Sequence, residues 1–273
     1  MKKIAFCFLC QDDIYHVNIW ESFFKYNYEK CNIYIYSENP NNVKTQFCKK
    51  YQVSHNNEKT DNTYLKIKFL MKDAVKFNNY KIVIINDSSI PVKSFNYIYD
   101  YLTKDNKSYI NYIDHIPKCE WQKSAILLQY QKYMYNVHNI PDFIYNIDIS
   151  NWYYNDKWVI FSLKHARQIL YDEKAIKILD KSFAIHENYP LYILSSNDEK
   201  KNISNEQNIY INWKDGTRNE NGGTDPKIYD IISKGDIKIF SYHKILFLTN
   251  VGKNSNINKY IDDILNPKNI NFS

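Results

Sequence analysis

Glycine is scarce in this chain of 273 residues and is missing from most of its length. All five glycines lie after residue 215. The dinucleotide-binding motif GxGxxG and the phosphate-binding P-loop both require glycines directly after a strand. Neither motif can therefore occur before residue 216. A nucleotide site in the first part of the chain has to hold its phosphates in another way.

Cysteine forms an odd, scattered set of five. Two of them make the one CxxC pair, and the first of that pair lies in an apolar run that is typical of a strand. A structural zinc site usually needs further ligands at a matching spacing. Buried free thiols are the better interpretation, and they favour a reducing compartment. The set is Cys7, Cys10, Cys31, Cys48 and Cys119.

Long apolar runs are also missing, and no stretch reaches the ~20 residues that span a membrane as a helix. The opening MKKIAFCFLCQDD imitates a secretory signal peptide. Its apolar run is short, lacks a small-residue cleavage site and ends at Asp12 and Asp13, so we interpret it as the first buried strand. The sequence predicts a cytoplasmic protein without a membrane span.

Arginine occurs only twice, at Arg167 and Arg218, and lysine carries most of the net charge of +6. No dense basic run stands out, and acidic residues are interspersed. This pattern does not favour a nucleic-acid groove. A mild positive balance suits an anionic small ligand equally well.

The first half of the chain alternates between strands and helices. Strands are predicted at residues 3–9, 32–37 and 80–86, and helices at 13–26, 63–77 and 94–103, with Leu65, Phe69 and Val75 as the apolar stripe of the second helix. Residues 38–62 read as a polar loop. This order predicts an α/β fold with a mostly parallel central sheet and helices on both faces. Ligands of such sheets bind beyond the carboxyl ends of the strands, which here are residues 11–13, 37–39 and 86–89.

The second half is less regular, with no repeat and no clear linker, so we expect one domain over residues 1–273. Ser162 is placed near a helix cap, Pro190 in the first turn of a helix that starts near Glu187, and Pro226 at the start of another helix. The predicted elements are a strand and helix over 157–170, helices at 172–182, 187–194, 226–233 and 256–265, and strands at 208–213 and 244–250.

Asp87 stands alone at the end of the strand at 80–86. Metal-dependent sugar-nucleotide transferases commonly place two carboxylates, D-x-D, at such a point, because Mg²⁺ or Mn²⁺ needs hard oxygen ligands. Here Asn86 and Ser88 flank the single aspartate. No metal site is expected. A lone aspartate at a strand end usually caps a turn, and it can also line a donor pocket.

Four blocks, in order, resemble the core-2/I-branching glycosyltransferases and their plant relatives: YKIVIINDSSIPVKSFNYIYDYL (80–102), WYYNDKWVIFSLKHA (152–166), SFAIHENYPLYIL (182–194) and YINWKDG…GGTDPKIYDIIS (210–233). With the N-terminal strands, the resemblance covers nearly the whole chain. It implies a GT-A-like, Rossmann-like fold. It also implies inverting transfer of a sugar from a UDP-sugar without a divalent metal or other cofactor.

Glu187 lies in the apolar stretch SFAIHENYPLYIL. A carboxylate there is costly to bury without a partner. Inversion requires one base to deprotonate the acceptor hydroxyl, and the resemblance places the family's base at Glu187. A helix N-terminus would favour its ionised form. The alternative is a helix cap that contacts a lysine. His186 is a weaker candidate, because adjacent helical residues point in different directions.

Without a metal, the leaving diphosphate needs protein cations. The resemblance places two basic residues near the C-terminus, and Lys227 and Lys253 fall at these positions, with Arg218 as a rival for Lys227. Ser37 stands where the family is commonly acidic, and Gln11 and Asp12 can line the same donor pocket with Asp87. The alternative is that Lys227 and Lys253 are two of many surface lysines.

Trp213 and Trp158 match family tryptophans near the acceptor, since flat aromatic faces stack on sugar rings. Core packing is the alternative, and it is favoured for Trp158, which lies inside an apolar strand. Lys157 is a candidate for contact with acceptor hydroxyls.

We therefore predict a glycosyltransferase that moves a sugar such as N-acetylglucosamine or xylose from a UDP-sugar to a glycan or glycoprotein hydroxyl. Two alternatives remain open. The unusual Ser37 and Lys227 suit a non-catalytic glycan- or nucleotide-binding module that keeps the fold, and a sugar-nucleotide hydrolase is a third reading.

Overall fold

The computed structural model describes residues 1–53, 63–113, 149–151, 153–173, 189–218 and 224–265. The predicted base Glu187, His186, Cys119 and most of the predicted helix at 172–182 lie outside these residues.

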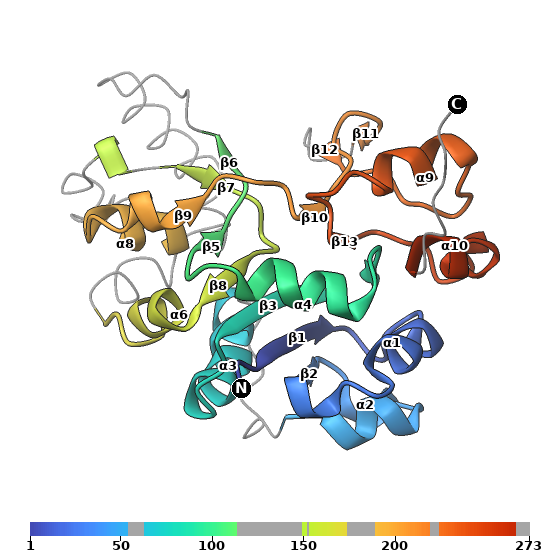
Figure 1. The fold of residues 1–273 in the computed structure, drawn as a ribbon, viewed down its shortest axis with the longest axis horizontal. Helices are drawn as coiled ribbons and strands as arrows, with labels where there is room; N and C mark the ends of the chain where they lie inside the picture. The colour runs from blue at the N-terminus through green and yellow to red at the C-terminus, as the bar shows by residue number, and fades with distance from the viewer. Residues whose placement is uncertain (54–62, 114–148, 152, 174–188, 219–223, 266–273) are drawn as a thin grey trace, which may run out of the picture.

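A six-stranded sheet forms the centre of the molecule (Figure 1). Three neighbouring strands are parallel, and β8 runs antiparallel to the strands on both its sides. The last pair, β5 and β9, is parallel again. In spatial order the strands are β2 (Cys31–Ser37), β1 (Ile4–Cys10), β3 (Lys81–Asn86), β8 (Ile160–Ser162), β5 (Ser108–Tyr109) and β9 (Ile203–Ser204). The predicted α/β fold with a mostly parallel sheet is confirmed.

Helices cover both faces of this sheet, because all seven residues of β1 are buried and alternate residues point to opposite faces. The Phe6 ring lies 5.0 Å from that of Phe24 in α1 (Val17–Phe24) and 6.3 Å from that of Phe95 in α4 (Phe95–Thr103). The next residue, Cys7, faces the opposite helix layer. There burial, and then the charge of Asp73 in α3 (Thr63–Lys76), raises the pKa of the thiol.

A second, smaller sheet brings the C-terminal part of the chain against the first. It contains β10 (Ile209–Tyr210), β13 (Phe247–Leu248) and β4 (Ile90–Pro91), with β10 and β13 parallel and β4 antiparallel to β13. The Phe247 ring stacks on Trp20 at 6.2 Å and lies 6.3 Å from Phe6. The two sheets therefore share one buried aromatic cluster. The single domain over 1–273 stays a prediction.

The remaining elements lie around these sheets. Two short antiparallel ladders pair β6 (Tyr112–Ile113) with β7 (Tyr154–Asn155) and β11 (Thr217–Arg218) with β12 (Thr224–Asp225). The helices are α2 (Gln46–Tyr51), α6 (Leu163–Leu170), α8 (Tyr189–Ser196), α9 (Lys234–Phe240) and α10 (Ile261–Leu265), and short 3₁₀ turns include Asn256–Lys259. Figure 1 shows α9 and α10 beside β10 and β13, and α6 and α8 on the other side of the view.

Several predicted helix boundaries are confirmed. Ser162 caps α6 by accepting a hydrogen bond from the His165 amide, and Ser94 caps α4 in the same way from Tyr97. Pro190 lies in the first turn of α8, where its missing N–H costs nothing.

The prediction of a helix over 226–233 is wrong. The Lys227 amide donates to Asn212 O and the Tyr229 amide to Asn250 O, so these donors are used between segments. The helix starts later, where Ser233 and Asp236 form a capping box at α9.

The polar segment 38–62 also departs from its prediction, since it contains α2. Thr45 caps this helix, and the Asp13 carboxylate accepts hydrogen bonds from the Lys44 amide at 2.7 Å and the Thr45 hydroxyl at 2.7 Å. Contacts from a residue far away in the sequence thus support this short helix.

Four cysteines, Cys7, Cys10, Cys31 and Cys48, are free and buried, as the interpretation of buried thiols predicted. Among the described residues, no cluster of three or more His, Cys, Asp or Glu side chains has the geometry to hold a metal ion. No helix in the described part of the chain is long and apolar enough to cross a membrane.

Candidate active site

The ends of the three parallel strands bring Gln11, Ser37 and Asp87 together. The Gln11 backbone amide donates to Asp87 Oδ2 at 3.0 Å, and the Ser37 hydroxyl donates to the Gln11 backbone carbonyl at 3.2 Å. Gln11 is exposed, whereas Ser37 is fully buried. Gln11 can therefore contact a ligand directly, and Ser37 supports the turn that presents it.

The Asp87 carboxylate is half-buried and accepts a hydrogen bond from the Gln11 backbone amide. Burial raises its pKa, while hydrogen bonds from the amides of Gln11 and Ser88 act in the opposite direction. The aspartate thus caps a turn, as a lone carboxylate at a strand end often does, and it lies at the same edge as Gln11.

The sequence did not point to an acidic residue and a buried lysine that lie at this edge. Glu38, directly after Ser37, pairs with Lys66 of α3 at 2.6 Å, and the lysine side chain is 8% exposed. Glu38 is close enough to contribute to the raised pKa of Asp87. Glu38 thus places a carboxylate one residue after Ser37, a position that spacing alone does not reveal.

Lys253 is exposed at the corner of a turn fixed against the strand ends. The Thr249 hydroxyl donates to Asn86 Oδ1 at 2.8 Å, and the Val251 amide donates to Ser88 O at 3.0 Å. The buried His16, which no sequence signal marked, has Nε2 3.0 Å from Gly252 O. These bonds join the Lys253 turn to the edge that carries Asp87.

The Asp230 side chain lies very close to Gly252. A Cβ atom added at this position would lie 1.8 Å from Asp230 Oδ1, far inside van der Waals contact. A larger residue at position 252 would therefore require the Asp230 side chain to move.

Lys227 lies on a segment that is hydrogen-bonded to the segment of Asn212 on one side and to the Lys253 turn on the other. Its amide donates to Asn212 O at 2.9 Å, and the Gly252 amide donates to Tyr229 O at 3.2 Å. The Lys227 ammonium pairs with Asp236 at 3.4 Å and lies 4.7 Å from the centroid of the Tyr229 ring. Part of its charge is therefore already engaged.

Trp213, which follows Asn212, is 46% exposed. Trp158 is only 9% exposed, with the Lys157 ammonium 4.8 Å from its ring centroid, so burial favours the core-packing interpretation for Trp158. Asp156, one residue before Lys157, has its pKa raised by burial, and the nearby Asn111 and Trp213 side chains oppose this rise. Sequence reasoning did not single out this aspartate.

These contacts connect six predicted site residues along one edge of the molecule, which we call the rim: Ser37, Gln11, Asp87, Lys253, Lys227 and Trp213. Arg218 is exposed on the β11–β12 hairpin, which leaves the rim after Trp213 and returns before Lys227. The predicted donor residues thus run along the whole rim, and Lys227 and Arg218 lie at the end that also carries the predicted acceptor tryptophan.

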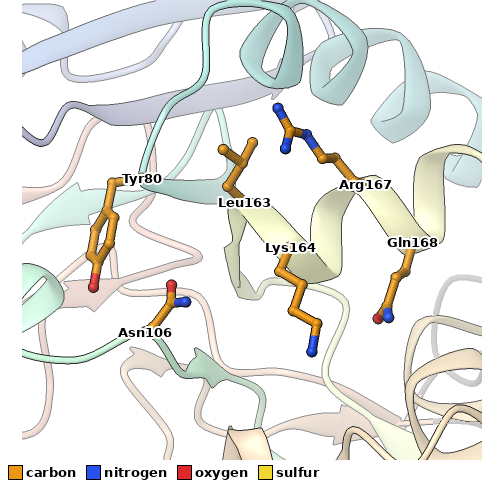
Figure 2. A pocket seen from close by; sticks show the side chains of 6 residues that line it. All are labelled: Tyr80, Asn106, Leu163, Lys164, Arg167 and Gln168. Atoms are coloured by element: carbon orange, nitrogen blue, oxygen red, sulfur yellow. The ribbon is translucent and has the colours of Figure 1, made fainter.

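A cavity of about 490 Å³ lies elsewhere, at the opposite edge of the sheet. The Leu163 amide donates to Tyr80 O, and β8 ends beside the first residue of β3, so this cavity is at the amino end of β3. Figure 2 shows Lys164 and Gln168 extending from one side of α6 and Leu163 and Arg167 from the other. The cavity does not include any predicted site residue.

The comparison with protein families decides the assignment. The family described as Core-2/I-Branching enzyme matches residues 4–241. The chain belongs to the core-2/I-branching enzyme family. This membership confirms the predicted resemblance and, at the level of the family, the predicted enzyme class of glycosyltransferase.

Individual relatives of this core-2/I-branching protein are distant. The glycosyltransferase BC10 of Oryza sativa subsp. japonica is 22% identical over 190 residues, which cover 66% of this chain and 43% of BC10. The chain thus spans less than half of that curated relative. A solved structure titled WbbM bifunctional glycosyltransferase, apo form, is 12% identical and covers 97% of this chain and 49% of its own, with a TM-score of 0.38.

Proposed function

We propose that the chain is an inverting glycosyltransferase that uses a UDP-sugar and transfers a sugar such as N-acetylglucosamine or xylose to a hydroxyl of a glycan or glycoprotein. Family membership supports the transferase class. The observation that carries the proposal is the rim, on which candidate donor residues and an exposed tryptophan lie on consecutive hydrogen-bonded segments.

Lys253 is proposed to bind the diphosphate, because its side chain is exposed on a turn that is fixed by several hydrogen bonds. An ammonium group offers a point charge with three donors. It would stabilise the negative charge that develops as the bond from the anomeric carbon to the diphosphate breaks. Lys227, partly engaged by Asp236, is proposed to help, and Gln11 and Asp87 to contact the nucleoside.

Glu187 is proposed to be the base. In this reaction it accepts the proton of the acceptor hydroxyl, the hydroxyl oxygen attacks the anomeric carbon, and the diphosphate leaves from the opposite face, which inverts the configuration. Trp213 and Lys157 are proposed to bind the acceptor. We further propose that no divalent metal takes part.

The experiment is sugar transfer from UDP-N-acetylglucosamine and UDP-xylose to an acceptor panel in EDTA, with the anomeric product followed by NMR. Glu187→Gln should lower turnover by at least about 100-fold, within the usual range for a general base, while Glu173→Gln, an exposed glutamate, should not. Turnover that needs added Mn²⁺ would overturn the metal-free proposal. A Glu187→Gln protein with full turnover would overturn the assignment of the base.

The second candidate is a binding module without turnover. The ion pair between Lys227 and Asp236 favours this second candidate, because a lysine whose charge is balanced by a carboxylate stabilises a leaving group less. UDP binding without transfer or donor hydrolysis across the panel would support this alternative. Release of free sugar with no acceptor product would instead identify a hydrolase.

A further inference from the structure

Exposed apolar side chains gather between residues 228 and 242. Ile231 is 79% exposed and Ile228 is 64% exposed, and Ile239 and Tyr242 are exposed as well. Among the side chains that the structure describes, Ile113 is the only exposed isoleucine outside this stretch. Single exposed apolar residues are common on protein surfaces, whereas a group of them marks a surface that binds a partner or a membrane.

The backbone on both sides of Ile231 is fixed by Asn256. The Asn256 amide donates to Asp230 O at 3.2 Å, and the Ile232 amide donates to Asn256 Oδ1 at 2.7 Å. Asn256 Nδ2 in turn donates to Ile232 O at 3.2 Å. On the same segment Tyr229 and Ile232 are buried. Ile231 would have to break these bonds to turn inward, so its side chain stays directed to solvent.

The helix α9 packs against this segment and adds lysines to the surface. The ring of Phe240, at the buried side of α9, lies 5.4 Å from the ring of Tyr229. Lys234, Lys238 and Ile239 are exposed. Residues four apart are neighbours on a helix, so the two lysines lie one turn apart. The outward side of α9 therefore carries both positive charge and an isoleucine.

This part of the chain is positive as a whole. Residues 226–260 contain six lysines and two aspartates, and six minus two gives +4 of the net charge of +6. Lys227 and Lys244 each pair with a carboxylate, and the Asp230 side chain lies against Gly252. The exposed isoleucines thus lie on a surface that attracts anions.

Lysine beside exposed isoleucine fits a lipid surface better than a protein partner. The centres of protein interfaces are depleted of lysine and enriched in arginine and aromatic residues, and residues 226–260 contain no arginine. At a bilayer, aliphatic side chains enter the boundary of the acyl chains while lysines extend to the headgroups. Anionic lipids add attraction for each lysine near the surface.

We propose that six side chains bind the surface of an anionic lipid bilayer and form what we call the isoleucine surface: Ile228, Ile231, Lys234, Lys238, Ile239 and Tyr242. The isoleucines enter the boundary of the acyl chains, and the lysines contact headgroup phosphates. None of the six residues belongs to the proposed donor or acceptor positions, so the inference goes beyond the proposed function and does not depend on it.

The test is co-sedimentation of the full chain with vesicles of phosphatidylcholine alone and of phosphatidylcholine and phosphatidylglycerol in equal parts. The mixed vesicles should bind the protein at least about tenfold more tightly, because two lysines meet an anionic surface. Added salt should weaken this binding, because it screens exposed charges. Absence of binding to the mixed vesicles, or equal binding to both kinds, would overturn the proposal.

Two isoleucine variants test the apolar contact. Ile228→Ser combined with Ile231→Ser should weaken binding to the mixed vesicles at least about tenfold, because two apolar side chains no longer leave water. Ile113→Ser is the matched control, since Ile113 is exposed elsewhere, and it should bind like the wild type. Thermal unfolding shows whether each variant keeps its fold. Equal binding of the double variant and the control would contradict the assignment.

Two lysine variants test the charge. Lys234→Gln combined with Lys238→Gln should remove most of the preference for the mixed vesicles. Lys72→Gln combined with Lys76→Gln removes the same charge from exposed positions four apart on α3 and should keep that preference. Equal loss in both double variants would show that only the net charge matters and would overturn the isoleucine surface.

Controls without vesicles and with UDP separate the other outcomes. Self-association of the wild type that is lost in the isoleucine double variant would identify an interface between copies of the chain and overturn the lipid assignment. Vesicle binding through these residues without use of any UDP-sugar would leave the isoleucine surface standing while the transferase proposal fails. Turnover of a UDP-sugar without vesicle binding would do the reverse.

Discussion

The strands β1 to β3 and the C-terminal strands β10 and β13 differ in what holds them in place. In the first region, β1 and β2 are seven residues each and mostly buried. In the second, each strand has two residues, and side chains complete the pairing, as where Asn208 Nδ2 donates to Lys244 O at 2.7 Å. Strands pair over seven residues in the first region, whereas the short strands of the second, whose Phe247 and Leu248 are also buried, are joined by side-chain hydrogen bonds as well.

This difference bears on the site, because the two regions meet at the rim. Gln11 and Asp87 belong to strand ends of the first region, whereas Lys253, Lys227 and Trp213 belong to segments of the second. A long apolar strand tolerates changes at its end, whereas a segment held by a few hydrogen bonds moves when one of them is lost. We therefore expect substitutions in the first region to affect mainly stability, and those in the second to affect ligand binding as well.

The largest expected effect is in the first region. Phe6 is fully buried, with ring neighbours on α1, α4 and β13. Phe6→Ala should lower the free energy of unfolding by about 3–5 kcal/mol, through lost burial and the cavity that remains. Urea unfolding checks this, with Phe77→Ala as the control, because Phe77 is 62% exposed. Equal losses in the two variants would contradict a burial-dominated first region.

Two buried lysines allow the regions to be compared by pH. Burial lowers the pKa of Lys81 in β3 to about 8, and of Lys93, whose ammonium donates to Phe240 O at 2.7 Å, to about 8. Between pH 8 and about 10.4 the unfolded state binds more protons at these sites, so the stability that each contributes rises with pH. Below pH 8 the cost of burying the charge is fully present.

Urea unfolding of the wild type, Lys81→Met and Lys93→Met at pH 7.0 and pH 9.5 measures this effect. The wild type should gain roughly 1–2 kcal/mol relative to each variant between the two pH values. The comparison with the variants removes the contribution of tyrosines, which also titrate in this range. Parallel pH dependence of the wild type and both variants would show that neither lysine has the lowered pKa.

The smallest expected change in stability is at the hydrogen bond between Thr249 and Asn86, which joins the two regions and which we call the seam. Thr249→Val removes the hydrogen bond to Asn86 Oδ1, which still accepts from the Ser89 hydroxyl. The free energy of unfolding should fall by about 1 kcal/mol. UDP affinity should fall as well, because this bond helps to fix the Lys253 turn. Isothermal titration checks the affinity. Loss of stability with unchanged UDP affinity would show that the seam does not position the turn.

The sequence predicted the first region well because its apolar runs have a clear period. The strands at 32–37 and 80–86 agree with β2 and β3 to within one residue. The buried face of α3 was less accurate. Val75 is buried as predicted, but Leu65 and Phe69 are only partly buried, while Ile67, Leu70 and Met71 are buried instead. A helix that contacts both the sheet and α6 buries a wider face than one stripe describes.

The second region could not be predicted to the same extent. Pro226 permits a helix start, but the amides of Lys227 and Tyr229 are used by Asn212 and Asn250, which are neighbours only in the folded chain. The hydrogen bond between Asn111 and Asp156 likewise joins residues distant in sequence. Residue types suggested candidate site residues, and the long-range hydrogen bonds that place them have no local signal.

The most direct test of the rim as a donor site is UDP binding in EDTA by the wild type and Lys253→Gln. Lys72→Gln is the matched control, since Lys72 is an exposed lysine on α3. A charge-assisted contact contributes about 1.5–3 kcal/mol, so Lys253→Gln should bind UDP roughly 10- to 100-fold more weakly, and Lys72→Gln should bind like the wild type. Equal UDP affinity of the wild type and Lys253→Gln would contradict the account.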